Sequence, residues 1–111
     1  MSNSAANNHY QQAVRLRAEG KSSEAMEAFR AAAQLDPRLI DAQFQLGVML
    51  YELKDLGGAE AAFQGVLQVD RENAFARTSL GCIAYARGNI DQAISLFKVA
   101  LQSDPGYALA H

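Results

Sequence analysis

The sequence is poor in the residues that mark several classes of protein. Cys82 is its only cysteine, so no disulfide can form within the chain, and a disulfide-stapled secreted scaffold is excluded. The net charge is −2 and no basic stripe is present, which argues against nucleic acid and anionic membranes as partners. The polar segment 1–12 lacks the apolar run of a signal peptide or a membrane span. We therefore expect no membrane insertion and a cytoplasmic location.

The residues that are present suit a single globular domain. The chain has 111 residues, of which half are hydrophobic and about a fifth are charged. Disordered chains carry fewer apolar residues, so this composition predicts a folded protein of ordinary domain size.

The strongest signal in the sequence is a recurrence at one constant interval. An alanine followed four positions later by a phenylalanine recurs in phase, as Ala25 with Phe29, Ala59 with Phe63, and Ala93 with Phe97. A fixed period of this length indicates a repeat architecture. It divides the chain into an N-terminal tail expected to be disordered, three repeats and the start of a truncated fourth repeat: 1–5, 6–39, 40–73, 74–107 and 108–111.

Each copy shows the pattern of two helices joined by a turn. In the third copy, apolar residues at helical spacing precede Gly88-Asn89, and a second apolar stripe then runs to Asp104-Pro105. The second copy has Lys54 in place of the turn glycine and Arg71 in place of the terminating proline, and each departure is expected to weaken the local signal by about 1 kcal/mol.

The helix–helix packing within a copy is expected to depend on Gly47 and Gly81. Because they lack a Cβ, we expect them to let the first helix approach the small residue of the second, Ala59 or Ala93. The phenylalanines of the repeat are then expected to fill the space between one hairpin and the next.

These residues resemble the tetratricopeptide repeat (TPR) family, in which each repeat has the pattern W-x2-L-G-x2-Y, then A-x3-F, then P. The A-x3-F pair is intact in all three copies, Leu-Gly is present in the second and third, and proline closes the first and third. The tryptophan position holds His9, Gln43 and Arg77 instead. The resemblance implies an all-α fold, an α-solenoid of three helix-turn-helix hairpins in a right-handed superhelix.

The resemblance also implies a concave groove lined by the first helix of each repeat. The groove positions carried over from the family are mostly apolar and aromatic. They are Tyr10, Val14, Arg17, Asp41, Phe44, Gln45, Val48, Tyr51, Phe75, Thr78, Cys82 and Tyr85. The family pattern also places Asn7 at a groove position of the first repeat.

Such a groove predicts a protein partner, a peptide or helix with apolar anchors, bound by an adaptor, scaffold or chaperone. Replacing Tyr51 or Tyr85 with alanine is expected to abolish binding without loss of helicity. One variant of the family captures a C-terminal carboxylate with lysine, arginine and asparagine side chains. The matching positions here include Val14, Phe75 and Ser79, so the cations are missing and no carboxylate clamp is expected.

No catalytic or metal site is expected. His9 and His111 lie at opposite ends of the array, and no histidine lies near Cys82 to activate its thiol. We therefore expect neither enzymatic activity nor a cofactor. Two alternatives stay open, a docking or regulatory segment of a larger enzyme, and a self-assembling structural scaffold.

The two ends of the array are expected to differ. Gln12-Ala13 replaces the apolar Leu-Gly of later copies, which suits the first unit of an array. At the other end of the array, a following helix would be needed to cover the apolar side chains of Ile94, Phe97 and Leu101. Either the chain is part of a longer protein, or the C-terminal edge is covered by a second copy, giving a homo-oligomer.

Overall fold

The computed structural model describes residues 4–103, which form six α-helices joined by short turns. Their bounds are α1 Ser4–Ala18, α2 Ser22–Leu35, α3 Ile40–Glu52, α4 Leu56–Val69, α5 Ala74–Ala86 and α6 Ile90–Ser103. The prediction of helix pairs is confirmed. Ser4 and Ala5, placed in the disordered tail by the sequence, belong to α1. The predicted terminator Pro105 and segment 108–111 lie outside the described residues.

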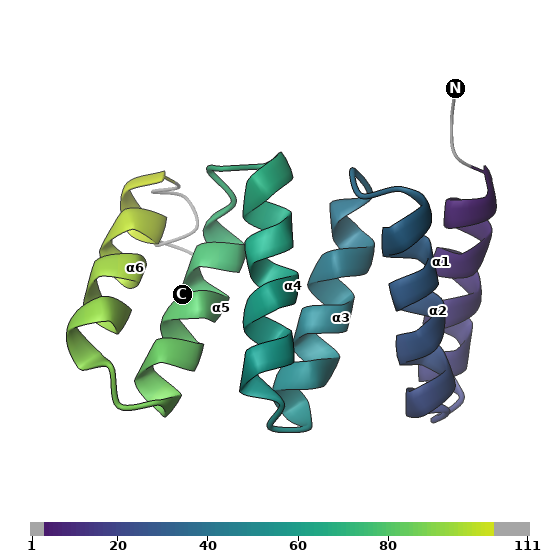
Figure 1. Cartoon of the computed structure of the whole chain (residues 1–111), viewed down its shortest axis with the longest axis horizontal. Helices are drawn as coiled ribbons and strands as arrows, with labels where there is room; N and C mark the ends of the chain where they lie inside the picture. The colour runs from purple at the N-terminus through teal and green to yellow at the C-terminus, as the bar shows by residue number, and fades with distance from the viewer. Residues whose placement is uncertain (1–3, 104–111) are drawn as a thin grey trace.

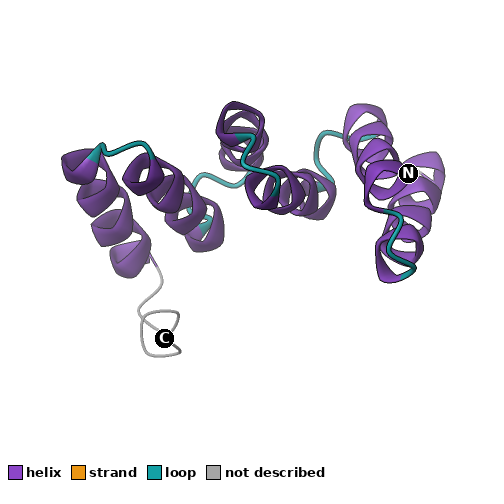
Figure 2. Ribbon diagram, turned by 90° about the horizontal axis from the view of Figure 1, so that it is seen from below, coloured by secondary structure: helices purple, strands orange, loops and turns teal. Residues whose placement is uncertain are grey.

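The helices stack as three antiparallel hairpins in a row (Figure 1). Within a hairpin the two helices pack closely, α1 on α2, α3 on α4 and α5 on α6, and each hairpin meets the next through α2 with α3 and α4 with α5. Seen from below, the hairpins lie side by side along the long axis (Figure 2). Neighbouring hairpins must therefore supply each other's core, as expected for a repeat protein.

The turns within the hairpins share one backbone conformation. Gly20 and Gly88 have positive φ values of 82° and 83°, and Lys54, at the same place in the second hairpin, has a φ of 68°. In all three turns the amide just beyond this position bonds back toward the last turn of the helix, for example Asp55 N–H to the Leu50 carbonyl at 2.9 Å. The turn geometry is thus preserved even where lysine replaces glycine.

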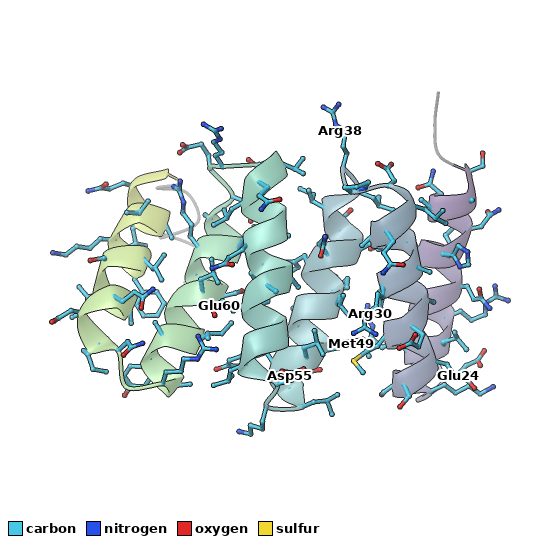
Figure 3. All side chains as sticks on the ribbon, in the orientation of Figure 1. Glu24, Arg30, Arg38, Met49, Asp55 and Glu60 are labelled. Atoms are coloured by element: carbon cyan, nitrogen blue, oxygen red, sulfur yellow. The ribbon has the colours of Figure 1, made fainter. Side chains whose placement is uncertain are left out.

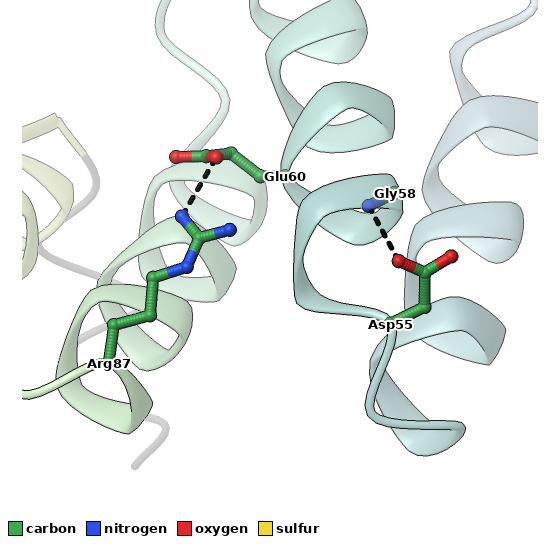
Figure 4. A network of polar contacts seen from close by, with 4 residues as sticks. All are labelled: Asp55, Gly58, Glu60 and Arg87. Carbon is green, nitrogen blue, oxygen red and sulfur yellow. Dashed lines mark hydrogen bonds and ion pairs between the residues drawn. The ribbon is translucent and has the colours of Figure 1, made fainter.

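The second hairpin has a helix cap next to the turn in which Lys54 adopts a positive φ. Asp55 lies at the turn between α3 and α4 (Figure 3), and its carboxylate accepts a hydrogen bond of 3.0 Å from the Gly58 amide at the start of α4 (Figure 4). A cap of this kind typically stabilises a helix by about 1 kcal/mol.

The same view shows an ion pair between neighbouring hairpins. Arg87, at the end of α5, pairs with Glu60 of α4 at 2.8 Å.

The core is built from the phenylalanine and alanine positions of the repeat. Phe29 and Phe63 are almost fully buried, as are Ala25, Ala59 and Ala93. Within residues 4–103 no buried polar or charged side chain occurs. The core therefore consists of the periodic apolar residues, and its contacts run from one hairpin into the next.

The expected role of the glycines is wrong in one respect. A Cβ built on Gly47 would lie 2.8 Å from the ring of Phe63, and one on Gly81 would lie 2.6 Å from the ring of Phe97. The nearest atoms are therefore aromatic and belong to the same hairpin, and are not those of Ala59 or Ala93. In the second and third hairpins the glycine makes room for the ring itself, whereas the first hairpin has Ala13 at this position.

Candidate binding groove

The twelve residues predicted to line a groove all retain some exposure to solvent, and the structure divides them into three groups. Six line two neighbouring hollows between α3 and α5: Asp41, Phe44, Val48, Tyr51, Phe75 and Cys82. Tyr10, Arg17 and Gln45 form a polar cluster between α1 and α3. Val14, Thr78 and Tyr85 line neither hollow.

The first hollow lies at the amino-terminal ends of α3 and α5 and is called the N-terminal hollow below. It encloses about 250 Å³ and is lined by Ile40, Asp41, Phe44, Val66, Asn73 and Phe75. The Phe44 ring packs on Phe63 beneath it, with centroids 5.5 Å apart, and meets Phe75 edge to face at 6.4 Å. Phe75 is 54% exposed although it is aromatic, so its ring presents apolar surface to solvent.

The second hollow lies further along the same two helices and is called the C-terminal hollow. It encloses about 110 Å³ and is lined by Val48, Tyr51, Phe63, Ser79 and Cys82. No ionisable carboxylate, ammonium or guanidinium group belongs to this lining. The two hollows together form the α3–α5 groove.

The groove carries one thiol on its wall, that of Cys82. Within residues 4–103 no three His, Cys, Asp or Glu side chains gather closely enough to hold a metal ion. Cys82 is a free thiol, half-buried, on the wall of the C-terminal hollow.

Two models of the tetratricopeptide repeat match the sequence, one over residues 16–80 and the other over residues 57–108. The first covers more than half of the 111 residues. The chain belongs to the tetratricopeptide repeat family. The predicted family is thereby confirmed, and with it the α-solenoid fold. No curated protein sequence gives a significant match.

Solved TPR structures share the fold at low sequence identity. MamA superposes with a TM-score of 0.86 at 21% identity, over 96% of this chain and 63% of the MamA chain. The first TPR of Spaghetti (RPAP3), solved with the HSP90 peptide SRMEEVD, superposes with a TM-score of 0.84 at 17% identity, over 95% of this chain and 83% of that one. The chain thus spans less than two thirds of MamA, and these likenesses concern the fold alone. Within the described residues no helix has the length and apolar character needed to span a bilayer.

The TPR register explains why the C-terminal hollow is open. One repeat earlier, the positions of Tyr51, Phe63 and Ser79 hold Arg17, Phe29 and Gln45, which lie between the first two repeats. There the Arg17 guanidinium hydrogen-bonds to the Gln45 side chain and lies over the Phe29 ring, 5.4 Å from its centroid. The first interface is therefore filled by its own side chains, and the corresponding positions of the second leave a hollow.

The same polar cluster changes the environment of Tyr10. Its ring meets Phe29 edge to face, with centroids 5.6 Å apart. Burial, and next the negative charge of Asp41, raise the pKa of the Tyr10 phenol, while the Arg17 cation opposes the rise. The phenol is therefore neutral at physiological pH.

Sequence reasoning missed part of the lining. Ile40, Val66 and Asn73 line the N-terminal hollow but were not among the predicted groove residues, and Phe63 and Ser79 were not assigned to the C-terminal one. Asn73 could have been recognised as a helix cap, because its side chain accepts a bond of 2.8 Å from the Ala76 amide at the start of α5. No pattern in the sequence points to Val66, which reaches the hollow from α4.

Proposed function

We propose that this TPR domain is a protein-interaction module that binds a segment of another protein through apolar anchors in the α3–α5 groove. The main observation in support of this proposal is the pair of adjoining hollows, whose walls are mainly aromatic and aliphatic. Tyr51 and Phe75 remain 37% and 54% exposed, although burying aromatic rings is favourable. Concave surfaces with partly exposed aromatic groups are where binding energy concentrates.

The structural neighbours support a peptide as the partner. Both the first and the second TPR of Spaghetti (RPAP3) were solved with the HSP90 peptide SRMEEVD, so the same fold accommodates a peptide there. In this chain the positions that would have to supply cations for a terminal carboxylate include Val14, Phe75 and Ser79. We therefore propose an apolar mode of binding, with an adaptor, scaffold or chaperone role, no activity of its own and a cytoplasmic location.

The test begins with selection of ligands from a random peptide library on the immobilised chain, followed by calorimetric titration of the enriched peptides. We expect Tyr51→Ala and Phe75→Ala each to weaken binding at least tenfold, because each truncation removes an aromatic wall of a hollow. Tyr85→Ala, expected from the sequence to abolish binding, should have a smaller effect because Tyr85 lines neither hollow.

Leu53→Ala provides the matched control, since Leu53 is 61% exposed and lies outside the groove lining. Its affinity for the selected peptides should equal that of the parent chain, and circular dichroism should show the same helix content in all variants. Unchanged affinity in both Tyr51→Ala and Phe75→Ala would contradict binding in this groove.

A further inference from the structure

The N-terminal hollow contains one carboxylate without a cationic partner. Four of its lining residues, Ile40, Phe44, Val66 and Phe75, are apolar, and Asp41 is the only one that carries a charge. The Asp41 side chain is exposed, and among the described residues no ion pair of 4.0 Å or less includes it. A carboxylate beside aromatic walls is an incomplete site for a cation.

Three arginines of the neighbouring elements are engaged elsewhere or point away. The Arg17 guanidinium is bonded to Gln45 and lies over Phe29. Arg77 pairs with Glu72 at 3.7 Å. Arg38, in the loop before α3, projects away from the helices (Figure 3).

The helix ends around the hollow offset only part of the charge of Asp41. The positive ends of the α3 and α5 dipoles lie at this hollow, but α4 runs antiparallel to them and ends there with its negative end. The Asn73 side chain, which lines the hollow, is already used twice: it accepts from the Ala76 amide and donates to the Asp70 carboxylate at 3.2 Å. Asp70 adds a second negative charge behind the wall.

The spacing of the two hollows restricts what can fill both. Phe44 and Tyr51 are seven residues apart in α3, as are Phe75 and Cys82 in α5. At a rise of about 1.5 Å per residue, the hollows lie roughly 10 Å apart along the groove. That distance matches residues i and i+7 of a bound helix, or residues i and i+3 of an extended chain.

We propose that the groove selects a basic segment: a lysine or arginine enters the N-terminal hollow, and an aliphatic side chain about 10 Å away enters the C-terminal hollow. The alkyl stem of the basic residue packs on Phe44 and Phe75, and its head pairs with Asp41. The C-terminal hollow has no charged lining and takes the aliphatic group. An acidic side chain in the N-terminal hollow would face Asp41 and be repelled. This inference rests on the proposed function and specifies the chemistry of its partner.

The experiment uses the full chain and a panel of synthetic peptides in an alanine and glutamine host. The helical probe carries lysine and leucine seven residues apart, in either order, and an extended probe carries them three apart. Matched peptides replace lysine by norleucine, which keeps the stem without the charge, or by glutamate. Affinities are measured by fluorescence anisotropy for the parent chain, Asp41→Asn and Asp91→Asn. Asp91 is the matched control because, like Asp41, it is the second residue of its helix.

We expect the lysine peptide to bind the parent chain up to about fivefold more tightly than the norleucine peptide, which is the upper end of the range for an exposed ion pair. Asp41→Asn should remove that difference without weakening the norleucine peptide, and Asp91→Asn should leave it intact. The glutamate peptide should bind most weakly. Raising the salt concentration should reduce the lysine preference.

Equal affinity for lysine and norleucine, or a lysine preference that survives Asp41→Asn, would overturn the inference. The proposed function would still stand in that case, because a norleucine peptide sensitive to Tyr51→Ala binds through the apolar walls. If no peptide of the panel binds, the basic segment is also refuted. The proposed function is then decided by the random-library selection, which assumes no charge.

Discussion

At the scale of single residues, the three intra-hairpin turns repeat one backbone conformation with different side chains. Gly20, Lys54 and Gly88 occupy the same register position and have φ values of 82°, 68° and 83°. A residue with a Cβ is strained in this left-handed region by about 1–2 kcal/mol, whereas glycine is not. The lysine is therefore a local defect that the rest of the second repeat tolerates.

Lys54→Gly should raise the free energy of unfolding by about 0.5–1 kcal/mol, which is the relieved strain less the extra freedom of glycine in the unfolded chain. Urea denaturation measures the gain. Lys54→Ala is the matched control, since it removes the lysine side chain but keeps the Cβ, and should give no gain.

The reverse change, Gly20→Lys, should lower the free energy of unfolding by about 1 kcal/mol. No atom lies within 4 Å of a Cβ at Gly20, so any cost is conformational. Equal stabilisation by glycine and alanine at position 54 would refute the strain.

At the scale of helices, the close approach of α3 and α4 depends on a glycine beneath an aromatic ring. Gly47→Ala should lower the free energy of unfolding by about 1–2 kcal/mol. Overpacking against the buried Phe63 ring, 2.8 Å from the new Cβ, outweighs the better helix propensity of alanine. Chemical denaturation with circular dichroism measures the loss.

Gly57→Ala is the helical control, because no atom lies within 4 Å of its Cβ position. It should stabilise α4 by roughly 0.5 kcal/mol from propensity alone. Combining Gly47→Ala with Phe63→Leu should show favourable coupling, since the smaller side chain makes room for the methyl group. A loss at Gly57→Ala as large as at Gly47→Ala would show that steric contact with Phe63 is not the cause.

The helices were predictable because each depends on local chemistry that recurs once per repeat. Gly88-Asn89 and Asp36-Pro37 interrupt helical spacing where the structure ends its helices, and the A-x3-F pair identified the buried face. The hollows were not predictable in this way, because they depend on differences between copies. Arg17 and Gln45 bond to each other at the first interface, whereas Tyr51 and Ser79 at the matching positions of the next interface leave space between α3 and α5. The serine at position 79, which is smaller than Gln45 of the preceding repeat, was the available signal.

At the scale of the whole molecule, the two edges of the stack are chemically different. Three large apolar side chains on one face of α6, namely Ile90, Ile94 and Leu101, are 45–47% exposed. At the same register positions of α4 stand Leu56, Glu60 and Leu67, each of them partly buried. The face of α4 is covered because α5 packs on it. The same face of α6 therefore has the composition of a helix–helix interface.

Covering that face with a second copy of the chain would bury apolar surface, which is favourable at about 25 cal/mol per Å². We therefore predict that the 12.0 kDa chain self-associates as its concentration rises, which sedimentation equilibrium measures. Ile94→Glu should abolish association, because burying a carboxylate without a partner in an apolar contact is costly. Leu53→Ala, far from α6 on the α3–α4 turn, should associate like the parent chain. A monomer mass at every concentration would contradict the predicted homo-oligomer.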